Sequence, residues 1–257
     1  METIMQSLAK PASASTMLGD APRLSQSPAP SAARRTMSPE ASERKAPTLR
    51  RPPSIVTIII GPENSQETFI VHKDLICHYS PFFSTAFNST FTEGLTKTMT
   101  LPDVDLNNFG LFVHWLYTQK IDLNTQNSDA VLPLAQLWTL AERFQAIKLQ
   151  NSIMDHLRIL VEFAEKHNLK DFLHYAYESK ETNPLKRLAA YRMAWKTTKQ
   201  ALAAWIDHLP EGVLVDIVMS LKKEHVRGKP SEGKGMGDAR EYYVEAKRVV
   251  KAGPGES

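Results

Sequence analysis

The sequence of 257 residues lacks paired cysteines and long apolar runs. It holds a single cysteine, Cys77, and no apolar stretch approaching the ~20 residues needed to span a bilayer. One cysteine excludes an internal disulfide and fits a reducing compartment. The first residues, from Met1 to Met5, lack the basic start and apolar core of a secretory signal. We therefore expect an intracellular protein, in the nucleus or the cytoplasm, that does not insert into a membrane.

Large apolar residues are scarce before residue 54, and that stretch holds eight of the sixteen prolines. A segment of this composition buries too little surface to offset the loss of chain entropy. Residues 1–53 are therefore predicted to be a disordered tail rich in Pro, Ser and Ala. At the other end, residues 226–257 are predicted to be a flexible basic tail. Within that tail, residues 241–251 have the pattern of a short final helix.

Charge is unevenly distributed along the chain. Residues 1–53 carry 8 Lys and Arg against 4 Asp and Glu, residues 54–221 carry 14 against 18, and residues 222–257 carry 9 against 6. The net charge of +3 thus comes from the two ends, whereas the central part is mildly acidic. This balance argues against a broad nucleic-acid-binding surface, and nucleic acid is not an expected partner.

The central part begins with strand patterns and continues with helical ones. β-branched residues at 56–60 and 67–71 flank a turn at 62–66 and predict a β-hairpin, with a third short strand at 99–101. A helix is expected to begin near Lys73, and Ser80-Pro81 ends it and starts another, because serine caps helices and proline fits their first position. Apolar spacing predicts further helices at 106–118, 128–139 and 140–156. A small sheet with clustered helices is an α+β fold, placed at residues 54–160.

An all-helical extension is predicted to follow at residues 161–225. Apolar spacing favours helices at 170–178, 184–197, 199–209 and 213–221. His167 and His174 lie seven residues apart, but a loop at Asn168-Leu169 is expected between them. Both histidines are therefore interpreted as exposed side chains without a shared function.

Three ordered blocks in residues 54–160 form a recognisable pattern. The first runs aromatic-x-x-His-Lys-x-x-Leu-x-x-x-Ser-x-x-Phe and is carried by Phe69, His72, Lys73, Leu75 or Ile76, Ser80 and Phe83. The second comprises Leu101-Pro102-Asp103, Phe109 and Trp115-Leu116-Tyr117-Thr118, and the third comprises Leu140-Ala141-Glu142-Arg143-Phe144 with Leu149-Gln150-Asn151. Together they resemble the BTB/POZ domain, specifically the kind abundant in filamentous fungi. The resemblance implies a BTB/POZ-like fold.

Two groups of side chains invite a chemical interpretation. His72, Cys77 and His78 are metal-binding residue types, but a structural zinc takes four ligands at paired spacings. Ser80 with His72 and Asp74 has the residue types of a nucleophilic site, but no glycine-rich elbow presents the serine, and its role as a helix cap accounts for it. No catalytic residue, cofactor site or metal site is predicted, and the protein is expected not to be an enzyme.

Aromatic residues are numerous in the domain, and most of them are expected in the core. Those left outside would form a groove for a partner peptide or helix. The predicted partner-binding residues are Phe82, Phe87, Phe91 and Tyr117.

The resemblance implies a protein–protein interaction module that self-associates or docks a cullin-type ubiquitin-ligase scaffold, which would make this chain a substrate adaptor. The alternative is a nucleic-acid-associated transcriptional regulator that acts by recruiting partners, although the zinc fingers usual in such proteins are excluded by the single cysteine. A mitochondrial or metabolic enzyme is a third class, which no catalytic set in the sequence supports.

The oligomeric state is predicted from the segment ahead of the first strand. The strand-swapped dimer common in this family uses a helix and a strand placed there. In this chain residues 46–54 contain Pro47, Pro52 and Pro53 and almost nothing apolar. Proline interrupts helices and removes donors from a β-ladder. We therefore predict a monomer, or weak self-association through another face.

Overall fold

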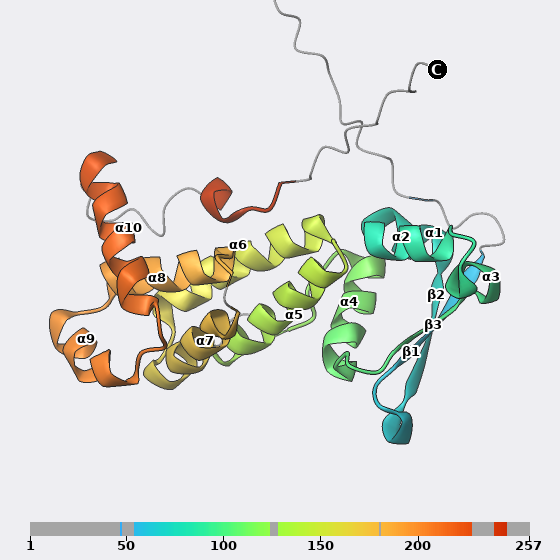
Figure 1. Cartoon of the computed structure of the whole chain (residues 1–257), viewed down its shortest axis with the longest axis horizontal. Coiled ribbons are helices and arrows are strands. Elements are labelled where there is room, and N and C mark those ends of the chain that lie inside the picture. The colour runs from blue at the N-terminus through green and yellow to red at the C-terminus, as the bar shows by residue number, and fades with distance from the viewer. Residues whose placement is uncertain (1–46, 48–53, 124–127, 180, 228–238, 246–257) are drawn as a thin grey trace, which may run out of the picture. The chain divides into compact units, whose positions relative to one another are not determined.

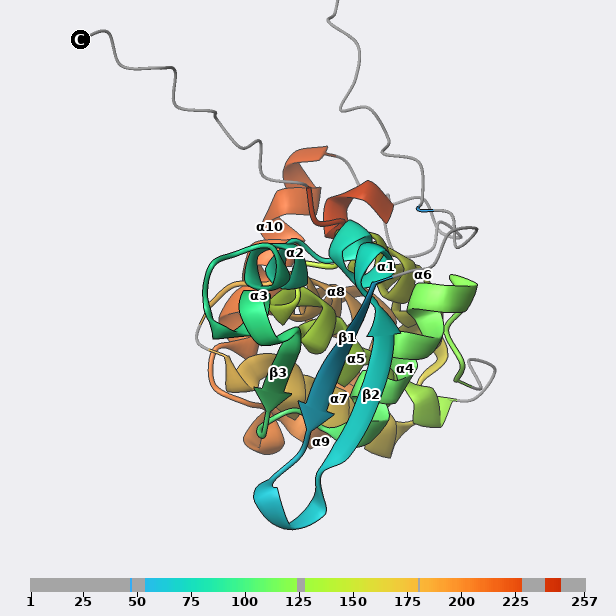
Figure 2. The same cartoon turned by 90° about the vertical axis from the view of Figure 1, so that its right-hand side faces the viewer.

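The computed structural model describes residues 47, 54–123, 128–179, 181–227 and 239–245. The fold contains a three-stranded sheet, in which the strands lie side by side in the order β2-β1-β3 (Figure 2). Strand β1 (Ile55–Ile60) pairs antiparallel with β2 (Glu67–His72) and parallel with β3 (Thr98–Leu101). The predicted hairpin and third strand are confirmed. A short 3-10 turn, η1 (Glu63–Ser65), connects β1 to β2.

Gly61 allows the chain to leave β1 at this turn. Its φ of +95° lies in the left-handed region, and a Cβ placed there would lie 2.9 Å from the carbonyl oxygen of Ser65. Any other residue would therefore be strained both by its backbone conformation and by the close approach of the turn.

The two faces of the sheet differ sharply. Side chains that alternate along the strands are buried on one face, where they form the sheet's part of the core: Val56, Ile58, Ile60, Val71, Met99 and Leu101. The other face holds Ile55 and Ile70, which are exposed, together with threonines of all three strands. This alternation is what a sheet covered by helices on one side requires.

Four helices accompany the sheet, three of them between β2 and β3 and the fourth after β3. Helices α1 (Lys73–Tyr79) and α2 (Pro81–Phe87) are separated at Ser80, whose hydroxyl oxygen accepts a hydrogen bond from the Phe83 N–H at 3.2 Å. The predicted Ser-Pro boundary is confirmed. Helix α3 (Thr92–Thr96) precedes β3, and α4 (Leu106–Thr118) follows it, capped by Asp105, which accepts from the Asn108 N–H at 2.9 Å. Helix α4 packs against α5 (Val131–Arg143), which links the sheet region to the later helices (Figure 1).

The predicted helix at 140–156 does not exist as one element. After the 3-10 turn η2 (Ser128–Ala130), helix α5 (Val131–Arg143) extends past its predicted end at residue 139, and α6 (Ile147–Phe163) begins after a break. Gln145 in the break has a φ of 56°, in the left-handed region. Phe144 is fully buried at this point among the aromatic rings of α2 and α4. The chain thus turns so that one aromatic ring can enter the core.

The extension is helical, as predicted, with different boundaries. It comprises α7 (Lys166–Glu178), α8 (Pro184–Lys196), α9 (Lys199–Trp205), the 3-10 turn η3 (Ile206–His208) and α10 (Val213–Arg227). Helix α8 packs against α6, α7 and α10. The expected loop at Asn168-Leu169 is wrong, because α7 runs unbroken through both histidines and buries Leu169.

The C-terminal part departs furthest from expectation. Residues 239–245 are not a flexible tail: they contain the 3-10 turn η4 (Ala239–Tyr242), which packs against α6 and α8 and buries Tyr242. The prediction of a helix at 241–251 is therefore wrong for its first residues, which end a 3-10 turn. Residues 246–257 lie outside the described part. Residues 1–53, apart from Pro47, also lie outside it.

The α+β fold with a helical extension is confirmed for the residues that the structure describes. None of their helices has both the length and the apolar character that crossing a bilayer demands.

Candidate protein-docking surface

The structure separates the four predicted partner-binding residues. Phe87 is 0% exposed, so the prediction is wrong for this residue, because a buried ring cannot contact a partner. Phe82 is half-buried and stacks on Phe144 with ring centroids 5.5 Å apart. Phe91 and Tyr117 are exposed, by 72% and 43%. Helix α3, which Phe91 caps, adjoins β3, whereas Tyr117 contacts β2 at the opposite edge of the sheet (Figure 2).

Phe87 is buried because it belongs to an aromatic cluster at the centre of the domain. Phe83 stacks on Phe87 at 6.0 Å between ring centroids and lies 4.8 Å from Phe144. Phe109 and Phe112 of α4 complete the cluster. The helical spacing of residues 82–87 places several aromatic rings close together, and only the packing decides which of them reach the surface.

The hydroxyl of Tyr117 is used within the protein. Its oxygen accepts a hydrogen bond from the backbone N–H of His72 at 3.2 Å and lies 2.8 Å from Nδ1 of the same histidine. Because the oxygen accepts from the N–H, its own proton is available for donation to Nδ1. Tyr117 therefore joins the end of α4 to the junction of β2 and α1, which is a structural role.

A second exposed apolar side chain lies next to Phe91. Leu95 is 75% exposed, and its N–H donates to the Phe91 carbonyl at 3.0 Å, so the two side chains lie one helical turn apart. We call Phe91 and Leu95 the α3 patch. The sequence analysis missed Leu95 because an isolated leucine in a five-residue helix produces no periodic pattern.

Helix α3 is held firmly against the α2–α3 loop. Gly94 is buried, and a Cβ there would lie 1.9 Å from the carbonyl oxygen of Ser89. Ser89 Oγ donates to the Ala86 carbonyl at 2.8 Å and accepts from the Phe91 N–H at 3.2 Å. At the other end of the helix, Lys97 Nζ donates to the Phe87 carbonyl at 3.1 Å. The α3 patch is therefore presented on a rigid support.

Gly94→Ala should destabilise the protein by about 1–3 kcal/mol, because the added methyl group can fit only if α3 moves away from Ser89. Urea unfolding followed by circular dichroism measures the change. Gly110→Ala in α4 is the matched control, since a Cβ there meets nothing within 4 Å. That variant should gain up to about 1 kcal/mol from the higher helix propensity of alanine. Equal changes in the free energy of unfolding for the two substitutions would contradict the close contact between Gly94 and Ser89.

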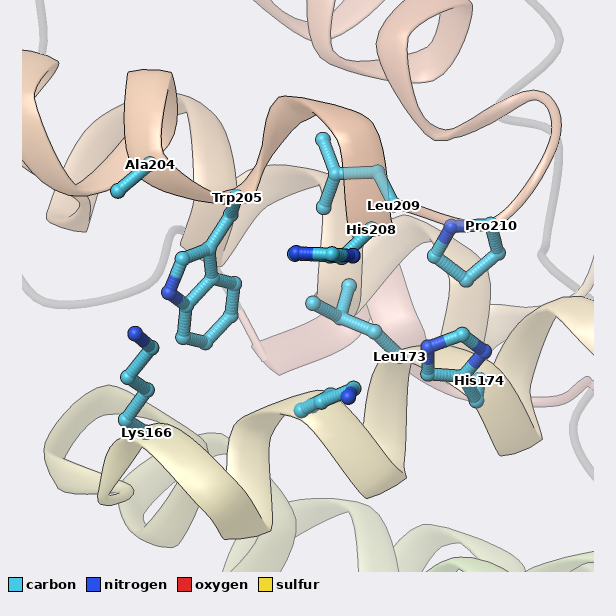
Figure 3. A pocket seen from close by; sticks show the side chains of 9 residues that line it. Lys166, Leu173, His174, Ala204, Trp205, His208, Leu209 and Pro210 are labelled. Atoms are coloured by element: carbon cyan, nitrogen blue, oxygen red, sulfur yellow. The ribbon is translucent and has the colours of Figure 1, made fainter.

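A small basic pocket lies in the extension, between α7 and the segment from α9 to Pro210 (Figure 3). Its volume is about 200 Å³, and Trp205 forms one wall with Lys166 Nζ 5.6 Å from the ring centroid. The lining contains two lysines, two histidines and no carboxylate: Lys166, Lys170, Leu173, His174, Ala204, Trp205, His208, Leu209 and Pro210. It favours an anionic group but is smaller than the ~300 Å³ at which cofactor sites begin.

The residues considered for metal or nucleophilic chemistry have other roles. Ser80 is fully buried, and its hydroxyl donates to the Phe144 carbonyl at 2.6 Å while it caps α2. Cys77 is half-buried, with Sγ 3.6 Å from the Phe83 carbonyl oxygen. Within the described residues, no three His, Cys, Asp or Glu side chains gather as they would around a metal ion.

Burial raises the pKa of the Cys77 thiol above its ordinary value of 9.0. We therefore expect iodoacetamide to alkylate Cys77 more slowly at pH 8 in the folded protein than in urea, because the thiolate is the reactive form. The rate should still rise above pH 9, whereas that of the unfolded chain should level off earlier. Since Cys77 is the single cysteine, mass spectrometry of the intact chain measures this reaction alone. A folded-state rate that levels off by pH 8 would contradict the expectation.

Comparison with known proteins agrees with this fold. The family model of the BTB/POZ domain matches residues 48–157. A BTB/POZ domain-containing protein of Arabidopsis thaliana is 29% identical over 127 residues, which cover 46% of this chain and 50% of that protein.

Two animal proteins with Kelch-like names are also similar. Kelch-like protein 40 of Xenopus tropicalis is 29% identical over 76 residues, 30% of this chain and 12% of that protein. Kelch-like protein 3 of Mus musculus is 23% identical over 175 residues, 68% of this chain and 26% of that protein. The chain thus spans half or less of the length of these three relatives. The match to the family model identifies residues 48–157 as a BTB/POZ domain.

Proposed function

We propose that this chain is a non-enzymatic protein–protein interaction module, acting in the nucleus or the cytoplasm, whose BTB/POZ domain docks a partner on the α3 patch. The observation that carries the proposal is the exposure of Phe91 and Leu95 on a helix fixed by the buried Gly94. Apolar side chains on a rigid support bind with little loss of conformational freedom. Aromatic residues, Phe among them, are enriched at protein interfaces relative to the rest of the surface.

We infer that the partner is a cullin-type ubiquitin-ligase scaffold, since BTB/POZ domains often dock one. The similarity to Kelch-like proteins supports this inference. The transcriptional regulator is less favoured, because residues 54–221 carry 18 acidic against 14 basic residues. We further infer that the domain is of the kind abundant in filamentous fungi, with the three sequence blocks as support.

A substrate adaptor also needs a surface for its substrate. Helix α10 supports a second surface, because it packs on α8 through Val213 and Ile217 yet leaves other apolar side chains in solvent. Up to residue 222, where the description of the α10 side chains ends, the exposed apolar residues of the helix are Leu214, Val215, Val218, Met219 and Leu221. We propose that this exposed apolar face of α10 is the surface for the substrate.

A binding measurement with a recombinant cullin scaffold tests the first surface. Replacing both Phe91 and Leu95 by Glu should weaken binding at least tenfold, about 1.4 kcal/mol, because two charges would then face an apolar partner surface. Ile70→Glu is the matched control, as Ile70 is 65% exposed on the outer face of the sheet, outside the α3 patch. This control should bind like the wild type, and biolayer interferometry gives all three dissociation constants.

Two results would overturn separate parts of the proposal. Unchanged binding by the double variant would remove the α3 patch as the docking site. A wild-type chain that binds no cullin scaffold would refute that partner. Affinity purification of the full chain, compared with the double variant, would then identify the protein that is lost with the patch.

A further inference from the structure

A short segment near the C-terminus, residues 240–244, lies across α6 and α8 as a bound peptide would. Asn151 of α6 contacts the backbone of this segment twice: Oδ1 accepts from the Val244 N–H at 2.9 Å, and Nδ2 donates to the Val244 carbonyl at 3.3 Å. One amide side chain thus satisfies both backbone groups of a residue 93 positions away in sequence. Contacts of this type recognise the main chain of a peptide whatever its side chain, as the main-chain hydrogen bonds of β-augmentation also do.

The two adjacent tyrosines of the segment provide the side-chain contacts. Tyr242 is 4% exposed, and its ring lies 5.6 Å from the guanidinium carbon of Arg158 on α6. Burial raises the pKa of its phenol. Tyr243 donates its hydroxyl to Asp155 Oδ1 at 2.6 Å. Asn151 and Asp155 lie one turn apart on α6, so one helical face binds both the backbone and a side chain.

Tyr242 also borders a cavity of about 380 Å³ between α8 and α10. The segment contributes Glu241 and Tyr242 to the lining, and the helices with residue 182 contribute the rest: Thr182, Lys186, Arg187, Ala190, Tyr191, Asp216, Met219 and Ser220. The segment therefore forms one side of the cavity between the two helices, and the cavity is not filled by it. A different peptide with a larger or longer side chain has room at this position.

The segment has the attributes of an exchangeable ligand. Within residues 240–244 a single side chain, that of Tyr242, is buried. The stretch that joins the segment to α10, residues 228–238, contains four glycines in eleven residues. Because the segment and the site belong to one chain, the segment binds intramolecularly, and a segment of weak intrinsic affinity stays bound. A partner's peptide with the same pattern competes for the same contacts.

We propose that the surface of α6 and α8 around Asn151 is a peptide-binding site for segments of the order aromatic-aromatic-aliphatic, and that residues 240–244 of this chain are its resident occupant. The chain's own Tyr242-Tyr243-Val244 fills the site until a segment of that chemistry from a partner displaces it. This site is distinct from the α3 patch and does not depend on a cullin partner.

A fluorescein-labelled peptide of residues 238–246, added to the full chain, tests the proposal. Tyr242→Ala should release the resident segment, so this variant should bind the peptide at least tenfold more tightly than the wild type in fluorescence anisotropy. Asn151→Ala added to that variant should weaken peptide binding at least tenfold. A control peptide with alanine in place of its first tyrosine should not bind. Equal binding by the wild type and Tyr242→Ala, or binding indifferent to Asn151, would overturn the proposal.

Hydrogen exchange on the wild-type chain provides a test that does not depend on the folding of a variant. A millimolar excess of the unlabelled peptide should speed exchange at the Val244 amide, which donates to Asn151. The control peptide should have no effect, and unchanged exchange with the active peptide would refute displacement. If light scattering shows a wild-type dimer that Tyr242→Ala abolishes, the segment binds a second copy of the chain. That result would overturn the proposal that the segment occupies the site of its own chain.

Discussion

Phe83→Ala is expected to lower the free energy of unfolding by about 3–5 kcal/mol. The ring is 0% exposed and lies within 4.8–6.1 Å, between centroids, of four other phenylalanine rings: Phe82, Phe87, Phe112 and Phe144. These rings come from α2, from α4 and from the break between α5 and α6. Removing Phe83 therefore leaves a cavity at the point where three parts of the domain meet, and none of them can close it alone.

Urea unfolding monitored by circular dichroism measures this loss, with the midpoint and the slope reported separately. Phe91→Ala is the matched control, because it removes the same ring from a site that is 72% exposed. The control should change stability by no more than about 0.5 kcal/mol. Leu116→Ala, also in the core, should cost about 2–5 kcal/mol. A Phe83 variant as stable as the Phe91 variant would show that the aromatic cluster is not the centre of the fold.

Local patterns predicted the elements that local chemistry determines. The β-branched strand β1, the serine cap at Ser80 and the apolar face of α4 were all correct. Each of these signals lies within a few residues of the structure that it specifies, as caps and amphipathic patterns do. The BTB/POZ resemblance also rested on Ser80 and on residues of α4.

The break between α5 and α6 has no such local signal. Neither glycine nor proline occurs from Arg143 to Ile147, yet Gln145 adopts a φ of 56°. A non-glycine residue in this region is unfavourable, so tertiary contacts must hold it there. They are the burial of the Phe144 ring and the bond from Ser80 to the Phe144 carbonyl, across 64 residues of sequence. Sequence periodicity cannot represent contacts of that separation.

The same limitation explains the errors at the candidate site and at the C-terminal segment. Phe87 and Phe91 are both aromatic residues near the end of α2, and only three-dimensional packing buries one and exposes the other. The docking of residues 239–245 depends on Asn151, which is 93 positions from Val244. The monomer prediction remains a prediction, because residues 48–53, with Pro52 and Pro53, lie outside the described part of the chain.

Ser80→Ala is expected to cost about 2–4 kcal/mol, although it removes only one oxygen atom. The hydroxyl is buried and makes two hydrogen bonds: it caps α2 by accepting from the Phe83 N–H at 3.2 Å, and it donates to the Phe144 carbonyl at 2.6 Å. Loss of a helix cap costs about 1 kcal/mol. The Phe144 carbonyl would in addition lose its partner, and a buried polar group left without one costs about 1–3 kcal/mol.

Thr198→Ala separates these two contributions, because Thr198 caps α9 by accepting from the Ala201 N–H at 3.2 Å and is exposed. This control loses a cap alone and should cost about 1 kcal/mol. The difference between the two variants, measured by urea unfolding, isolates the bond that joins the α1–α2 junction to the α5–α6 break. If the two substitutions cost the same, the bond from Ser80 to Phe144 contributes nothing. The left-handed turn at Gln145 would then depend on the burial of the Phe144 ring alone.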